Sequence, residues 1–121
     1  MEEKTLFIET FRARTRQIAI QCIRLVQDMP RTEEAGVLKK QLVRSASSCA
    51  ANYRSACRAR SRAEFYAKLS ITIEEADETL FWLELMEEAM ICTSANLKTL
   101  QQEITEIIKV LSKARKTLSN N

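Results

Sequence analysis

Six basic side chains in the middle of the chain have the spacing of a polyanion-binding surface. On a helix that turns about 100° per residue, four of them fall on one side within roughly 80°: Lys40, Arg44, Arg54 and Arg58. Only small Ser47 and Ala51 lie between them. This stripe is about 27 Å long, and arginine and lysine bind phosphate groups by charge and by hydrogen bonds. We therefore predict that RNA or DNA binds to Lys40, Arg44, Arg54, Arg58, Arg60 and Arg62.

The chain lacks the residues that acid-base, metal or nucleophilic catalysis would need. The chain has no histidine, which removes both the usual general base and the Glu-x-x-His pairs of dinuclear metal sites in helical bundles. Ser45, Ser47 and Ser48 stand near Arg44 but have no base to activate them, so we interpret them as small residues that let helices approach closely. We predict no catalytic residue, no metal site and no cofactor, and hence that the protein is not an enzyme.

The cysteines and the hydropathy indicate a cytoplasmic protein. Cys22, Cys49, Cys57 and Cys92 form no C-x-x-C pair and stand among apolar residues, as reduced core thiols do. No apolar run resembles a signal peptide or approaches the ~20 residues that span a bilayer. We therefore expect a soluble, cytoplasmic chain with no membrane partner.

Four helices must position these residues. Apolar residues recur at helical spacing over about 5–29, 33–58, 62–89 and 95–118, and the 121 residues include only one glycine and one proline. Pro30 should end the first helix at Met29, Thr32 should cap the second, and Ser61 with Glu64 should form a capping box for the third. Thr93 or Ser94 should cap the fourth. Short connections make neighbouring helices antiparallel, so the prediction is one all-α domain over 1–121, an up-down-up-down four-helix bundle.

The third helix carries apolar residues on two faces. One face is an ordinary core stripe, but the reverse face interleaves apolar and acidic side chains, and a single bundle can cover only one of the two. We interpret the reverse face as a subunit interface made of Ile71, Glu74, Glu75, Glu78, Trp82 and Leu85. The alternative is a set of scattered, exposed apolar residues.

Charge is unevenly distributed along the chain. Residues 1–68 hold 14 Lys and Arg against 7 Asp and Glu, whereas residues 69–121 hold 5 against 9. Such a chain can turn a basic surface toward a polyanion and an acidic surface toward a partner or solvent.

Several stretches of the second and third helices resemble a known family. The chain is similar to the 23S rRNA intervening-sequence proteins, also called the four-helix-bundle protein family, over about residues 7–115. The resemblance is carried by Gln41–Ser48, Ala51–Arg54, Arg58–Phe65 and Lys68–Leu69, and it continues through Glu74–Glu78 and Trp82–Leu85. The chain departs from the commoner pattern at Tyr53–Ala56, where many members have a small residue and Glu-Gly, and at Glu74–Glu75, where many have Gly-Ser.

The resemblance implies a small bacterial protein that assembles as a barrel-shaped homopentamer, and in some members the gene lies within a ribosomal RNA gene. The related accessory variability proteins of diversity-generating retroelements share the pentameric bundle, bind nucleic acid through a basic surface and contact a reverse transcriptase. The family offers no catalytic residues to carry over. Its implied partners are thus further copies of the chain, RNA or DNA, and a reverse-transcriptase-like or ribosomal partner.

Two alternatives to nucleic-acid binding stay open from the residues. In one, the protein is an interaction scaffold whose basic face docks an acidic or polymerase-like protein. In the other, Arg44, Arg54 and Arg58 pair across subunits with Glu74, Glu75 and Glu78, and both charged patches serve assembly.

Overall fold

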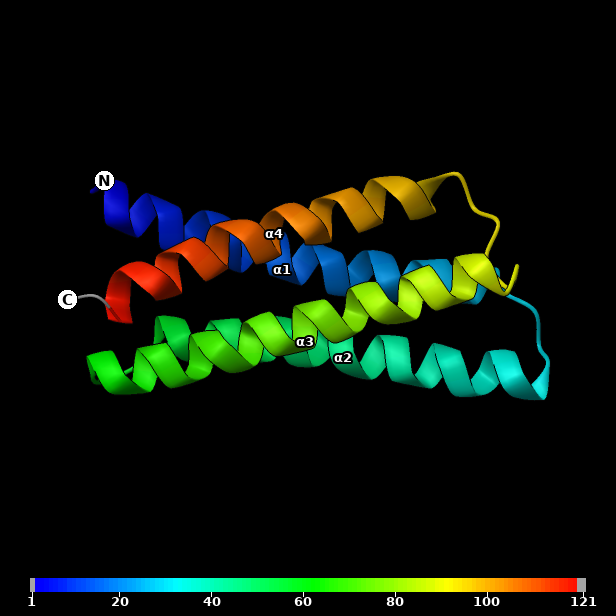
Figure 1. Cartoon of the computed structure of the whole chain (residues 1–121), viewed down its shortest axis with the longest axis horizontal. Coiled ribbons are helices and arrows are strands. Elements are labelled where there is room, and N and C mark those ends of the chain that lie inside the picture. The colour runs from blue at the N-terminus through cyan, green and yellow to red at the C-terminus, as the bar shows by residue number, and fades with distance from the viewer. Residues whose placement is uncertain (1, 120–121) are drawn as a thin grey trace.

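The computed structural model describes residues 2–119, which form an antiparallel four-helix bundle (Figure 1). The helices are α1 (Glu3–Gln27), α2 (Glu33–Cys57), α3 (Arg62–Glu88) and α4 (Asn96–Ser119), and the described part of the chain contains no strand. The neighbours α1–α2, α2–α3, α3–α4 and α1–α4 pack together, so α1 and α3 lie diagonally across the bundle. The predicted all-α bundle with up-down-up-down order is confirmed.

Side-chain caps fix where α2, α3 and α4 begin. Thr32 Oγ1 accepts a hydrogen bond from Ala35 N at 3.3 Å, and Ser61 Oγ accepts one from Glu64 N at 3.0 Å. Ser94, one of the two predicted caps, accepts a bond from Asn96 N at 3.2 Å. Each cap satisfies a helical N–H that has no partner within the helix, which replaces the Gly and Pro punctuation that the sequence lacks.

The predicted end of α1 at Met29 is wrong by two residues, because the α-helix ends at Gln27. Asp28 N and Met29 N donate to the carbonyl oxygens of Leu25 and Val26, three residues back, so the last turn is tightened. Pro30 disfavours helical geometry in the residue before it, and regular α-helix therefore stops earlier than the proline itself.

The end of α3 is built without the glycine that this motif usually contains. Met90 has a φ of 59° and its N–H donates to Glu87 O, while Ile91 N donates to Met86 O at 2.9 Å. These two bonds are the pair that defines a Schellman motif, in which the left-handed position normally belongs to glycine. Met90 is 79% exposed, so few side-chain contacts offset the cost of its left-handed backbone.

The core fills the space between the four helices. Its largest fully buried side chains include Tyr53, Leu42, Leu83, Met86 and Ile104. Cys22, Cys49 and Cys92 are buried, as expected, and Cys57 is half-buried; all four are free thiols. A central void beside Cys49 measures about 10 Å³, which is far below the volume of a ligand-binding cavity.

The bundle interior thus has no room for a small-molecule ligand at this void.

None of the helices described over residues 2–119 combines the length and the apolar character needed to cross a membrane.

Candidate nucleic-acid interface

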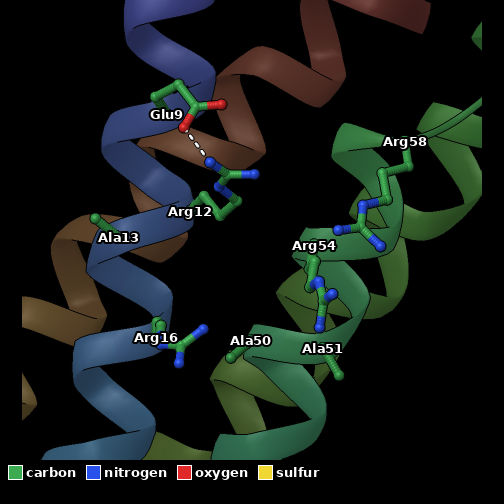
Figure 2. Close-up of a pocket in the computed structure, with 8 residues that line it drawn as sticks. All are labelled: Glu9, Arg12, Ala13, Arg16, Ala50, Ala51, Arg54 and Arg58. Atoms are coloured by element: carbon green, nitrogen blue, oxygen red, sulfur yellow. Dashed lines mark hydrogen bonds and ion pairs between the residues drawn. The ribbon is translucent and has the colours of Figure 1, made fainter.

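An open groove of about 580 Å³ lies between α1 and α2 and is rich in basic side chains (Figure 2). Four arginines line it together with one glutamate and three alanines: Glu9, Arg12, Ala13 and Arg16 from α1, and Ala50, Ala51, Arg54 and Arg58 from α2. We call this feature the arginine groove. Arg12 and Arg16 extend from α1 toward α2, and Arg54 and Arg58 lie on the facing side of α2.

Helical spacing and small residues together create the arginine groove. Arg12 and Arg16 are four residues apart, as are Arg54 and Arg58, so each pair lies on one face of its helix about 6 Å apart. The alanines between them leave the seam open, because a methyl group does not fill the space between two helix axes. Beneath the groove, Tyr53 is buried and its hydroxyl donates to Ile8 O at 3.3 Å, which ties α2 to α1.

The charges in the arginine groove are only partly balanced. Arg12 forms an ion pair with Glu9 on its own helix. Within residues 2–119, no carboxylate lies within ion-pair distance of Arg16, Arg54 or Arg58. Three guanidinium groups in one recess thus keep their hydrogen-bond donors for an anion or for water.

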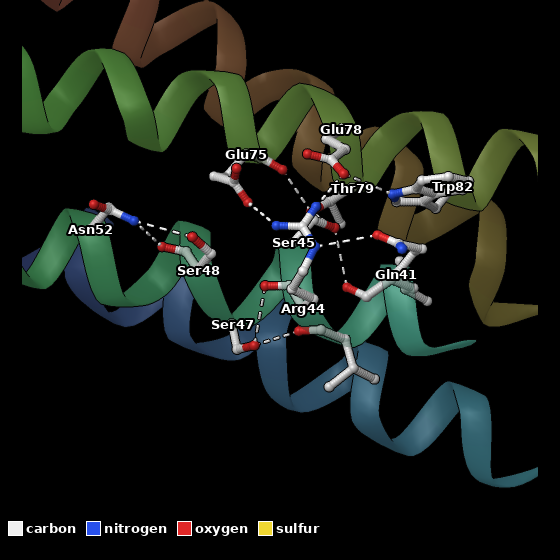
Figure 3. Close-up of polar contacts among 12 residues, drawn as sticks. Gln41, Arg44, Ser45, Ser47, Ser48, Asn52, Glu75, Glu78, Thr79 and Trp82 are labelled. Carbon is white, nitrogen blue, oxygen red and sulfur yellow. Dashed lines mark hydrogen bonds and ion pairs between the residues drawn. The ribbon is translucent and has the colours of Figure 1, made fainter. Parts of the chain in front are cut away.

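Arg44, the second member of the predicted stripe, is held by α3 instead (Figure 3). Its guanidinium contacts Glu75 at 3.2 Å and also Glu78, and its Nε donates to Gln41 Oε1. The hydrogen bond between Arg44 and Glu78 raises the pKa of Arg44 and holds the pKa of Glu78 below its ordinary value. The pairing of Arg44 with these glutamates is therefore present within one chain, whereas the sequence interpretation placed it between subunits.

The other predicted basic residues are dispersed. Lys40 is exposed in the second turn of α2, about 21 Å along the helix from Arg54. Arg60 is exposed in the turn between α2 and α3, and Arg62 donates to Leu118 O at 3.1 Å, which links the start of α3 to the end of α4. Of the six predicted residues, only Arg54 and Arg58 line the arginine groove.

Sequence reasoning missed the half of the groove that α1 supplies. Arg12, Arg14 and Arg16 alternate along α1, and a helical projection sends Arg12 and Arg16 to one side and Arg14 to another. Arg14 contacts Glu103 at 2.7 Å and Glu106 at 3.4 Å on α4, which raises its pKa through the Glu103 hydrogen bond. The signal was present as the four-residue spacing, but only packing identifies α2 as the neighbour of that face.

The reverse face of α3 is covered in part by the same chain. Glu75 and Glu78 are half-buried at the seam with α2, where both contact Arg44. Trp82 is half-buried against the core, and its Nε1 donates to Glu78 at 3.3 Å. The premise that this whole face needs a second subunit is therefore wrong, since α2 packs against one flank of it. Ile71 and Glu74 are exposed, Leu85 is half-buried, and Phe81, which the sequence interpretation omitted, is 51% exposed.

The fold and the groove define a small all-α bundle with four arginines around the seam of its first two helices. A family model described as 23S rRNA-intervening sequence protein matches residues 10–113, and the chain belongs to that family. A solved structure from Bacteroides thetaiotaomicron, described as a protein with unknown function from the S23 ribosomal protein family, is similar to it. The two share 32% sequence identity with a TM-score of 0.81, over 90% of this chain and 97% of that one. A comparison with curated proteins gives no significant match.

Proposed function

We propose that this protein is a non-enzymatic, homo-oligomeric bundle of the cytoplasm that binds RNA or DNA through the arginine groove. The observation that carries the proposal is the set of four arginines around one recess, three of which have no carboxylate partner among residues 2–119. The family description, which refers to an intervening sequence of 23S rRNA, supports nucleic acid as the anion. Four free thiols fit a reducing compartment.

The groove would bind the sugar-phosphate backbone rather than read bases. Guanidinium groups form charge-assisted hydrogen bonds with phosphate oxygens, and these contacts position a nucleic acid without specifying its sequence. The alanine side chains between the arginines have no donor or acceptor for base edges. Binding should therefore tolerate changes of sequence and should weaken steeply as salt rises.

A double charge reversal tests the site. Arg54→Glu with Arg58→Glu places two carboxylates in the groove and should abolish binding of a fluorescent oligonucleotide in an anisotropy titration at low salt. The matched control reverses Arg24 and Arg31, which are exposed and stand outside the arginine groove, and changes the net charge by the same amount. It should keep nearly all of the affinity, and both variants should keep the helical circular-dichroism spectrum.

The proposal fails if the two reversals weaken binding equally, or if the native protein binds no nucleic acid at low salt. It would also fail if the protein purified free of nucleic acid and captured a single acidic polypeptide in its place. That outcome would favour the scaffold, with a reverse-transcriptase-like or ribosomal protein as its partner.

The homo-oligomeric part of the proposal is a ring-shaped homopentamer in which the outer face of α3 contacts a neighbouring copy. Ile71 and Phe81 are 39% and 51% exposed on that face, and Glu74 lies between them. Phe81→Glu should lower the mass measured by light scattering after size exclusion. Val37→Glu, which alters a similarly exposed apolar residue on α2, should leave the mass unchanged. Equal behaviour of the two variants would remove α3 from the interface.

A further inference from the structure

We infer that the arginine groove is built for double-stranded nucleic acid and not for a single strand. This inference rests on the proposed function and specifies the form of its ligand. It follows from three features of the groove: the residue types that line it, the number of charges along its length, and the rigidity of its walls.

The lining offers nothing on which an unpaired base could stack. None of the eight lining residues is aromatic. Phe11 and Tyr53, which neighbour Arg12 and Arg54 in the sequence, are buried in the core. Exposed Tyr66 and Phe81 belong to α3, which contributes no residue to the lining. Proteins that hold single strands without sequence preference use aromatic stacking in addition to charge. A single strand would gain only its phosphate contacts here, and its bases would stay unpaired and unstacked.

The density of charge also favours a duplex. The α2 wall from Ala50 to Arg58 is about 12 Å long. A duplex carries one phosphate for each ~1.7 Å of its axis, or about seven over this length, whereas one strand at ~3.4 Å per phosphate presents about half as many. Two arginines from each helix form two rows that flank the recess, so both walls can contact phosphates.

The walls of the groove cannot fold around a flexible chain. Each arginine stands within a regular helix, and Phe11 and Tyr53 next to them are part of the packed core. The hydrogen bond from Tyr53 to Ile8 O fixes the two walls to each other. A preformed, open recess suits a ligand that is itself rigid, because neither partner then loses much conformational entropy on binding.

One labelled strand in two forms tests the inference. A 20-nucleotide RNA of pyrimidines only, which cannot pair with itself, is titrated with the full chain by fluorescence anisotropy, alone and after annealing to its purine complement. We expect the duplex to bind at least about tenfold more tightly than the strand, because it presents about twice as many phosphates to the two rows of arginines. A duplex with the base pairs shuffled should bind within about twofold of the first.

The variant Arg54→Ala with Arg58→Ala ties the preference to the groove, and it should reduce the advantage of the duplex to about threefold or less. Equal or tighter binding of the single strand would overturn the inference while leaving the proposed function intact. Binding of neither form would overturn both. A duplex advantage that persists in the double variant would assign duplex binding to another surface and would also overturn the inference.

Discussion

Arg44, Arg54 and Arg58 look equivalent along the sequence, yet the structure predicts opposite consequences for their removal. Arg54 and Arg58 line the arginine groove, whereas Arg44 contacts Glu75 and Glu78. We compare two double variants. The groove variant combines Arg54→Ala and Arg58→Ala, and the control variant combines Arg14→Ala and Arg44→Ala. Both double variants lose two positive charges, but only the first loses them from the groove.

The magnitude follows from counterion release. If each of the four groove arginines neutralises one phosphate of a duplex, the logarithm of the binding constant falls with the logarithm of salt at a slope of about −3.6. Between 50 and 200 mM salt, affinity should then fall about 150-fold for the native chain and only about 12-fold for Arg54→Ala with Arg58→Ala, whose slope is about −1.8. The control pair should keep the steep slope.

Thermal stability should separate the two double variants in the other order, because here only the control variant should be affected. Arg14 links α1 to α4 and Arg44 links α2 to α3, so the control variant should melt at a lower temperature than the native chain, whereas the groove variant should not. Anisotropy titrations across the salt series and thermal melts followed by circular dichroism give both quantities. If the control variant lost slope as much as the groove variant, binding would follow overall charge and the assignment to the groove would be refuted.

Three further predictions concern other residues. Met90→Gly should raise the free energy of unfolding, measured in urea, by up to about 1 kcal/mol, because glycine adopts the positive φ without strain. Met90→Ala keeps the Cβ and should have little effect. Equal gains from both variants would contradict this prediction. Burial raises the pKa of Cys22 and of Cys49 to about 12. Their thiols stay neutral in the folded chain and ionise first in the unfolded chain, so stability present below pH 9 should be lost between pH 9 and 12, by at most about 1.4 kcal/mol per pH unit for each thiol. Urea unfolding of Cys22→Ala with Cys49→Ala should show a shallower decline, and an identical decline would exclude the thiols as its cause. Glu9→Gln frees Arg12 and removes the one carboxylate lining the groove, so it should tighten duplex binding roughly twofold to fivefold in anisotropy titrations, and weaker binding would place the anion elsewhere.

The bundle was predictable because its signals are local. Apolar periodicity defines each helix, and Thr32, Ser61 and Ser94 cap theirs as the sequence indicates. The end of α3 was harder to predict, since Met90 occupies a position where glycine is the usual signal.

The site was predictable only in part, because a groove belongs to two helices at once. Arg54 and Arg58 emerge from the periodicity of α2 alone, whereas Arg12 and Arg16 become part of the site only when α1 packs beside them. Arg44 lies on the same projected stripe, but its long side chain reaches α3, and no single-helix projection registers a partner on another helix.

The central claim is that the guanidinium groups of the arginine groove contact nucleic-acid phosphates. Arginine Nε–Hε signals in a nitrogen-proton correlation spectrum, assigned by single Arg→Lys variants, report on each group during titration with an RNA duplex. The account predicts that the signals of Arg12, Arg16, Arg54 and Arg58 shift together with one affinity, while those of Arg14 and Arg44 stay in place. A shift of the Arg44 signal without any change at Arg16 and Arg54 would contradict it.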